Sequence, residues 1–258
     1  MLGQAGKAGR QNISQEKKEV KGMKGKTLCI IPARGGSKRI PHKNVRDFKG
    51  RPVISYSIKA AKESGIADIV MVSTDDGEIA KAAEAYGAEV PFMRSSENAD
   101  DRAGIAEVLI EVVENYQKLG RSFDYVVCIL ATAPLIKASD LKKAYGMLES
   151  HAEAGSICSV ESFSYPPQRG LRLKDGRLEM LDPGNYAARS QDLEKIYHDC
   201  GQFFIFRTAA LLRDRKLYTE YTLPFMLDET AAQDIDTDTD WKIAELKYEL
   251  LYGKEGKR

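Results

Sequence analysis

The chain has 258 residues, enough for one α/β domain with a full hydrophobic core and a small appendage. Its formal net charge is +1, so the composition indicates no general attraction to nucleic acid or to a membrane surface. No apolar run approaches the ~18 residues that a membrane-spanning helix needs, and the N-terminus lacks the apolar core of a signal peptide. We therefore expect a cytoplasmic protein that acts on a small molecule.

The N-terminal 25 residues are rich in Gly, Lys, Gln and Glu and nearly without apolar side chains. We expect them to be a disordered extension, with Met23 as a possible true start and one domain over residues 26–258. The four cysteines are far apart, mostly within apolar runs, and show no metal-ligand spacing. This pattern predicts buried free thiols in a reducing compartment.

The first predicted element is a buried strand at residues 27–31, which ends at Pro32 and opens into a loop rich in glycine and cations. Gly35 and Gly36 are expected to turn successive N–H groups inward as an anion-binding nest. Neither a P-loop nor a dinucleotide fingerprint follows this strand. The loop predicts a polyphosphate site built with four cations, Arg34, Lys38, Arg39 and Lys43.

Strands and helices then alternate along the chain. We expect helices at residues 52–64, 78–86, 103–118 and 139–149, and strands at residues 68–73, 87–92, 124–130 and 156–160. The alternation predicts a Rossmann-like α/β fold, with a mostly parallel sheet flanked by helices. Ligands of such sheets bind beyond the carboxyl ends of the strands, where the loops after the first, second and central strands lie.

Two polar segments near these strand ends allow both a structural and a ligand-binding role. The segment at residues 73–76 predicts the N-cap of the following helix, although its position also suits a ligand contact. Arg94 is a lone cation in an acidic loop, where it can form a surface ion pair or reach a bound anion.

The pattern changes after Gly155, where turn residues become dense. We expect hairpins in an arm at residues 163–197, with a loose surface loop as the alternative. Phe163, Tyr165 and Tyr186 are candidate anchors for a partner. An apolar strand at residues 203–206 then returns the chain to the core.

Four aspartates alternate before a predicted helix at residues 241–251. In an extended segment alternate side chains share a face, so Asp234 and Asp236 can converge on one cation, and their hard oxygens suit Mg²⁺. Asp240 is more simply explained as a helix N-cap, a role that Asp238 can share.

The segment at residues 31–44, IPARGGSKRIPHKN, resembles the opening motif of the CMP-sugar synthetases, the acylneuraminate-type cytidylyltransferases that activate acid sugars with CTP. The resemblance extends over residues 27–251 and implies a nucleotidyltransferase fold similar to that of GT-A enzymes. It places the nucleotide on Ala33, Arg34, Gly35, Gly36, Ser37, Lys38, Lys43, Asn44, Arg94 and Thr132.

Three segments make the resemblance closest to the pseudaminic acid cytidylyltransferases: ATAP at residues 131–134, RSQDLE at 189–194 and YHDCGQF at 197–203. Sialic acid enzymes usually have glutamine and arginine where this chain has Leu130 and Ile136. The start of the helix near residue 103 also lacks the Ser or Thr usual in the family, which leaves one base contact open. The implied sugar-binding residues are Arg189, His198, Asp199, Gln202 and Phe203.

The resemblance implies that CTP and an acid sugar, most simply pseudaminic acid, give a CMP-sugar and pyrophosphate. The implied catalytic residues are Arg34, Lys43, Asp234 and Asp236, with Mg²⁺ on the two aspartates and a homodimer formed through the arm. Such a product would serve surface glycan or flagellin glycosylation. N-acetylneuraminate, legionaminate and Kdo remain open as substrates, and a non-catalytic nucleotide-binding protein is the alternative from another class. A nicotinamide dehydrogenase is disfavoured by the absent fingerprint.

Overall fold

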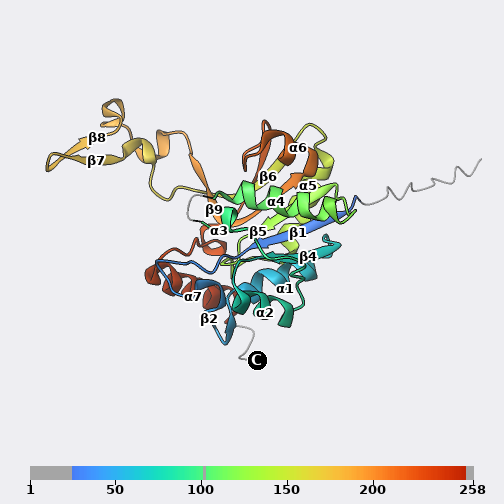
Figure 1. Ribbon diagram of the computed structural model, residues 1–258. Coiled ribbons are helices and arrows are strands. Elements are labelled where there is room, and N and C mark those ends of the chain that lie inside the picture. Colours follow the sequence, from blue (N-terminus) through green and yellow to red (C-terminus); the bar gives the residue numbers. More distant parts are fainter. Residues whose placement is uncertain (1–24, 101–102, 254–258) are drawn as a thin grey trace, which may run out of the picture.

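A computed structural model describes residues 25–100 and 103–253. The predicted extension and the possible start at Met23 lie outside the described residues, apart from Gly25. The central sheet has six strands, β1 (Thr27–Pro32), β4 (Ile69–Ser73), β5 (Tyr125–Ile129), β6 (Ser156–Ser162), β9 (Tyr197–Arg207) and β10 (Thr222–Met226). Their order is β10-β6-β9-β5-β1-β4, and only β9 runs antiparallel to its neighbours (Figure 1). The predicted mostly parallel sheet is confirmed.

Helices cover both faces of this sheet. One face packs against α1 (Ile54–Ser64), α2 (Gly77–Ala85) and α5 (Ala138–Ser150), and the other against α4 (Ile105–Lys118) and α6 (Thr208–Asp214). Along β1, Cys29 and Ile31 belong to the first core while Leu28 and Ile30 belong to the second. A strand covered on both sides must be apolar at successive positions, which explains its uninterrupted apolar run.

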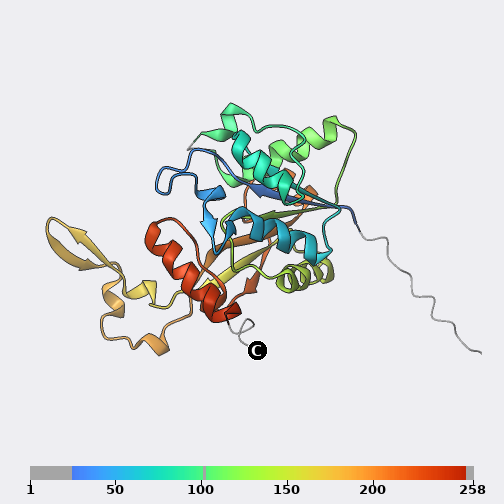
Figure 2. The same cartoon turned by 90° about the horizontal axis from the view of Figure 1, so that it is seen from below.

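A third cluster joins the two ends of the chain. The helix α7 (Asp238–Tyr252) packs beside the small hairpin of β2 (Asp47–Phe48) and β3 (Arg51–Pro52), as Figure 2 shows. The ring of Phe48 makes edge contacts with Tyr56 at 5.4 Å and with Trp241 at 5.6 Å between centroids. This packing brings the segment before α7 next to the basic loop after β1.

The predicted strand at residues 87–92 is wrong in extent. Only Glu89 pairs with the sheet, through a parallel bridge to Met71 and hydrogen bonds to Val70 and Val72. Pro91 lacks the N–H that would continue the ladder. A short helix follows this segment, α3 (Ser96–Ala99), and the sequence pattern indicated neither it nor α6 and β10.

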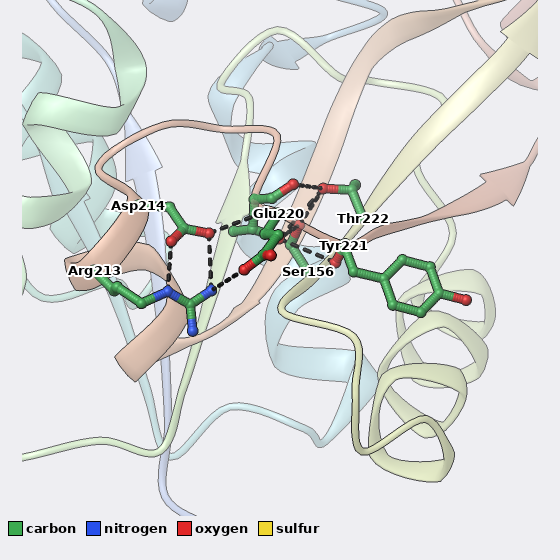
Figure 3. A network of polar contacts seen from close by, with 7 residues as sticks. Ser156, Arg213, Asp214, Glu220, Tyr221 and Thr222 are labelled. Carbon is green, nitrogen blue, oxygen red and sulfur yellow. Dashed lines mark hydrogen bonds and ion pairs between the residues drawn. The ribbon is translucent and has the colours of Figure 1, made fainter.

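The edge strand β10 is tied to β6 by a polar network (Figure 3). Ser156 hydrogen-bonds to Thr222 at 2.8 Å, and Asp214 accepts two hydrogen bonds from Arg213 at 2.6 and 3.0 Å. Asp214 also accepts the backbone N–H of Glu220 at 2.9 Å, which fixes the turn between α6 and β10. β10 contains a proline, which is tolerated because an edge strand leaves one side of its backbone unpaired.

Residues 163–196 form an arm that projects away from the sheet (Figures 1 and 2). Its tip is the hairpin of β7 (Leu171–Lys174) and β8 (Arg177–Met180), which confirms the predicted turn structure. The two turn residues, Asp175 and Gly176, both have positive φ, as a type I′ hairpin turn requires. The remaining short turns are 3-10 helices at Lys43–Val45, Pro167–Arg169, Pro183–Asn185, Ser190–Asp192 and Glu229–Ala231.

All four cysteines are free and buried, as predicted. Burial raises the pKa of Cys128 to about 12 and that of Cys200 to about 11, so these thiols stay protonated near neutral pH. Within the described residues, every helix is too short or too polar to cross a lipid bilayer.

Candidate functional site

A cavity of about 500 Å³ lies beyond the carboxyl ends of β1 and β5, where the sequence predicted the site. Seven of the ten predicted nucleotide-binding residues line it: Arg34, Ser37, Lys38, Lys43, Asn44, Arg94 and Thr132. Arg39 and Asp236 also line it. A cavity with five cations among its walls suits a polyanionic ligand.

The loop after β1 is held by a side chain of its own and by the end of β4. The Nδ2 atom of Asn44 donates to the carbonyl of Arg34 at 2.8 Å, and the N–H of Ala33 donates to the carbonyl of Ser73 at 2.9 Å. Asn44 therefore fixes the backbone conformation of the loop at Arg34. Ala33 is buried and extends the pairing of β1 with β4, and it does not line the cavity.

The predicted anion nest is not formed at Gly35 and Gly36. Neither glycine has a positive φ, and the N–H of Gly35 donates to Asp75 Oδ1 at 3.0 Å. Gly35 is still required sterically, because a Cβ there would lie 2.6 Å from Asp76 Oδ2. The cavity depends on the cationic side chains and not on a glycine nest.

The loop after β4 has the structural role that the sequence indicated. Asp76 is the N-cap of α2 and accepts hydrogen bonds from the N–H groups of Glu78 at 2.7 Å and Ile79 at 3.2 Å. Asp75 instead binds the loop after β1. The two adjacent carboxylates thus divide between capping a helix and connecting the two loops.

Arg94 is a buried cation in the wall of the cavity, with 8% of its surface exposed. Its Nε and Nη2 atoms donate to the hydroxyl and carbonyl oxygens of Ser73 at 3.1 and 2.5 Å. Burial lowers its pKa, because removal from water disfavours the charged guanidinium. The surface ion pair considered as its alternative role is absent in the described part of the chain.

Asp236 faces the cavity and is surrounded by cations. Its Oδ1 atom lies 2.9 Å from Arg39 and 3.6 Å from Lys43 Nζ, and Lys43 also donates to the carbonyl of Ile235 at 2.6 Å. The aspartate segment and the basic loop, separated by almost 200 residues in the sequence, are therefore in direct contact.

Asp234 lies against Gly201 of β9. An ideal Cβ on Gly201 would be 2.9 Å from Asp234 Oδ1, and Gly201 has φ of +66°. Asp234 is an exposed residue, but partial desolvation of its carboxyl by the surrounding protein raises its pKa, and repulsion from Asp236 raises it further. The two carboxylates are close enough to repel each other, but Asp236 lines the cavity and Asp234 is not among its lining residues.

The other two aspartates serve α7. Thr237 is the N-cap, and Asp240 completes a capping box by accepting the N–H of Thr237 at 2.7 Å. The prediction of Asp240 as the N-cap was therefore wrong by three residues. Asp238 pairs with Arg46 at 2.5 Å. Asp238 and Asp240 thus serve the start of α7, whereas Asp236 lines the cavity and Asp234 lies beside Gly201.

The predicted sugar-binding residues do not lie together in the structure. Phe203 is completely buried in the core against Phe225 and has no exposed surface facing the cavity. Gln202 is 3% exposed, and its amide donates to the carbonyl of Ala231 at 2.5 Å. Arg189 lies in the arm, where it pairs with Asp192 at 2.7 Å, so it does not line the cavity of its own chain. These three assignments are not supported as direct contacts within one chain.

His198 and Asp199 lie at the start of β9, near the root of the arm. The Nδ1 atom of His198 is 2.8 Å from the carbonyl of Asp199, and its ring is 4.5 Å from that of Phe163. Glu161, directly opposite His198 on β6, approaches its Nε2 atom to 3.8 Å. Burial raises the pKa of Glu161. The sequence offered no signal for Glu161, because only the strand register brings it to His198.

Leu130 and Ile136 replace the glutamine and arginine usual in sialic acid enzymes, and the structure places them in different cavities. Leu130 lines the cavity, whereas buried Ile136 faces a separate cavity of about 600 Å³ beside α1 and α7. Ile136 therefore does not line the cavity that contains the cations. The cavity that contains the cations is also lined by residues 103–105 at the start of α4, where Gly104 is the N-cap.

The sequence matches the cytidylyltransferase family over residues 28–237, a span that contains the basic loop and both site aspartates. The chain belongs to the cytidylyltransferase family. This cytidylyltransferase is 42% identical to the pseudaminic acid cytidylyltransferase of Campylobacter jejuni subsp. jejuni serotype O:2, over 87% of this chain and 97% of that one. It is 34% identical to the CMP-N,N'-diacetyllegionaminic acid synthase of Legionella pneumophila subsp. pneumophila, over 86% and 96% of the two chains.

A solved structure of a CMP:2-keto-3-deoxy-manno-octonic acid synthetase complexed with CTP has the same fold. The TM-score is 0.64 at 18% sequence identity, covering 89% of this cytidylyltransferase and 99% of that chain. At such low identity the likeness concerns the fold alone.

Proposed function

We propose that this cytidylyltransferase transfers CMP from CTP to pseudaminic acid and releases pyrophosphate. The observation that carries the proposal is the cavity in which five cations surround a space of about 500 Å³ bordered by Asp236. The similarity to the pseudaminic acid cytidylyltransferase of Campylobacter jejuni supports the choice of sugar, since it extends over almost the whole of both chains.

The chain's own cations provide the binding of the triphosphate. Arg34, Lys38 and Lys43 line the cavity and would offset the negative charge of CTP. Arg94 adds a buried charge that its bonds to Ser73 hold in one orientation. A fixed cation in a partly desolvated wall stabilises a phosphate more strongly than a mobile surface lysine does.

In the proposed reaction, the anomeric hydroxyl of the sugar attacks the α-phosphorus of CTP. A bond forms between the sugar oxygen and the α-phosphorus, the bond from that phosphorus to the bridging oxygen of pyrophosphate breaks, and the hydroxyl proton passes to water. Lys43 and Arg34 would stabilise the charge that develops on the departing pyrophosphate. No covalent enzyme intermediate is needed.

Asp234 and Asp236 would hold Mg²⁺. Proteins usually bind this ion through one or two carboxylates, and substrate phosphates and waters complete its shell, so the donor set fits. Over residues 25–100 and 103–253, no three His, Cys, Asp or Glu side chains are grouped to hold a metal by themselves. When bound, the ion would neutralise the charge on the α-phosphate and the acid sugar.

The arm supports the proposal of a homodimer. It exposes large apolar side chains, among them Leu173 at 74% and Tyr186 at 79% exposed, on a segment that projects from the rest of the chain. A second copy covering these side chains would remove their apolar surface from water. The buried free thiols agree with a cytoplasmic location.

The test of the proposal is pyrophosphate release from CTP and Mg²⁺ with each of four acids: pseudaminic, N-acetylneuraminic, legionaminic and Kdo. We expect the highest kcat/KM with pseudaminic acid. Equal or higher kcat/KM with another of these acids would overturn the choice of sugar. A protein that binds CTP but releases no pyrophosphate with any of them would instead be a non-catalytic nucleotide-binding protein.

A further inference from the structure

The segment Ala231 to Asp236 lies outside the sheet, yet it carries both site aspartates. Three long side chains from outside the segment, each on a different element, donate to its carbonyl oxygens. Gln202 Nε2 donates to Ala231 at 2.5 Å, and Lys247 Nζ donates to Ala232 at 2.7 Å. Lys43 Nζ donates to Ile235 at 2.6 Å. The conformation of this segment therefore depends on side-chain donors rather than on a strand partner.

We propose that Gln202 and Lys247 are positioning residues that fix the segment bearing Asp234 and Asp236. The inference rests on the proposed function, since it assigns these residues to the alignment of the two carboxylates. Neither residue needs to touch CTP, the sugar or a metal ion. They act through the adjacent carbonyls of Ala231 and Ala232.

The burial of the two carbonyl-bearing residues explains why donors are needed there. Ala231 is 8% exposed and Ala232 is fully buried, so water has little access to satisfy their carbonyl oxygens. A buried carbonyl without a donor is unfavourable, and the backbone would move to find one. Any such movement passes directly to Asp234, two residues after Ala232.

The two donors come from elements that are themselves rigidly packed. Gln202 lies on β9 in the middle of the sheet, and its neighbour Gly201 lies directly beside the Asp234 side chain. Lys247 lies on α7, which Trp241 and Ala244 anchor in the third core cluster. Because one donor belongs to the sheet and the other to the helix, the segment is fixed relative to both.

The test compares Lys247→Met and Gln202→Leu with Lys242→Met, a control on the exposed side of the same helix. We expect the first two variants to lower kcat at least ~10-fold, the scale of losses at groups that orient metal ligands, while KM for CTP changes less than ~2-fold. Amide hydrogen exchange across residues 231–237 should accelerate in both variants without bound metal or substrate. Lys247→Arg should restore kcat, since a guanidinium can still donate to Ala232, and Lys242→Met should match the unaltered protein.

Several results would overturn the inference. One is unchanged kcat in Lys247→Met and Gln202→Leu, whether or not hydrogen exchange accelerates. Another is a loss of kcat with unchanged exchange across residues 231–237. A separate Asp236→Asn variant distinguishes failure of the proposed function. If Asp236→Asn turns over normally, the carboxylate role is wrong; if it loses turnover while Lys247→Met does not, only the positioning role is wrong.

Discussion

Gly201→Ala is the substitution that tests most directly how β9 shapes the aspartate site. Gly201 has φ of +66°, a conformation that costs an L-residue about 1–2 kcal/mol. The new Cβ would also lie 2.9 Å from Oδ1, 3.0 Å from Cγ and 3.1 Å from Cβ of Asp234. Since carbon atoms pack best at about 3.5–4.0 Å, Asp234 must move by roughly 0.5–1 Å.

This displacement gives the expected effect on turnover. A misplacement of about 1 Å at a catalytic group can cost ~100-fold, so we expect Gly201→Ala to lower kcat by about 10- to 100-fold. Urea unfolding should show a loss of about 1–2 kcal/mol in the free energy of unfolding, from the backbone strain alone. Pyrophosphate release under saturating CTP and sugar measures kcat.

Gly65→Ala is the matched control. Gly65 has φ of +65°, and a Cβ there would meet nothing within 4 Å. It should lose a similar amount of stability but keep its kcat. If Gly201→Ala is as active as Gly65→Ala, Asp234 either yields without consequence or takes no part in the reaction, and the reasoning fails.

Four further predictions concern the same molecule. Asp236→Asn should lower kcat at least ~100-fold with little change in CTP binding, because one charge of the proposed Mg²⁺ site is lost. Asp238→Asn, at the helix start, is its control. Equal turnover in the two variants would contradict the role of Asp236 in the Mg²⁺ site. Lys43→Ala should weaken CTP binding as well as turnover, since it removes a cation from the triphosphate cavity; calorimetric titration with CTP measures this, and unchanged affinity would exclude the contact. Light scattering should report twice the chain mass for the protein and a monomer for Leu173→Glu, whereas a monomer in both would contradict the arm interface. At pH 8 the four cysteines should react with a thiol reagent only after unfolding, because burial raises their pKa values and keeps them protonated; rapid labelling of the folded protein would disagree.

Local pattern was enough to predict most of the fold. The apolar run at residues 27–31 is a strand covered on both faces, and the alternation of strands and helices produced the parallel sheet with its site beyond the strand ends. Periodicity and turn residues act over a few positions, so they are visible in a single chain. The same holds for the basic loop, most of whose polar side chains line the cavity.

Tertiary structure decided which residues face the ligand, because that depends on which distant segments meet. Neighbouring residues of the YHDCGQF segment differ in role: Phe203 enters the core, Gln202 holds Ala231, and Gly201 supports Asp234. The sequence alone predicted most strands of the sheet, the turns of the arm, the basic loop and the alternating aspartates. Only the packing of β9 and α7 around residues 231–236 decided how those aspartates are held, since register and long-range side-chain contacts leave no local pattern.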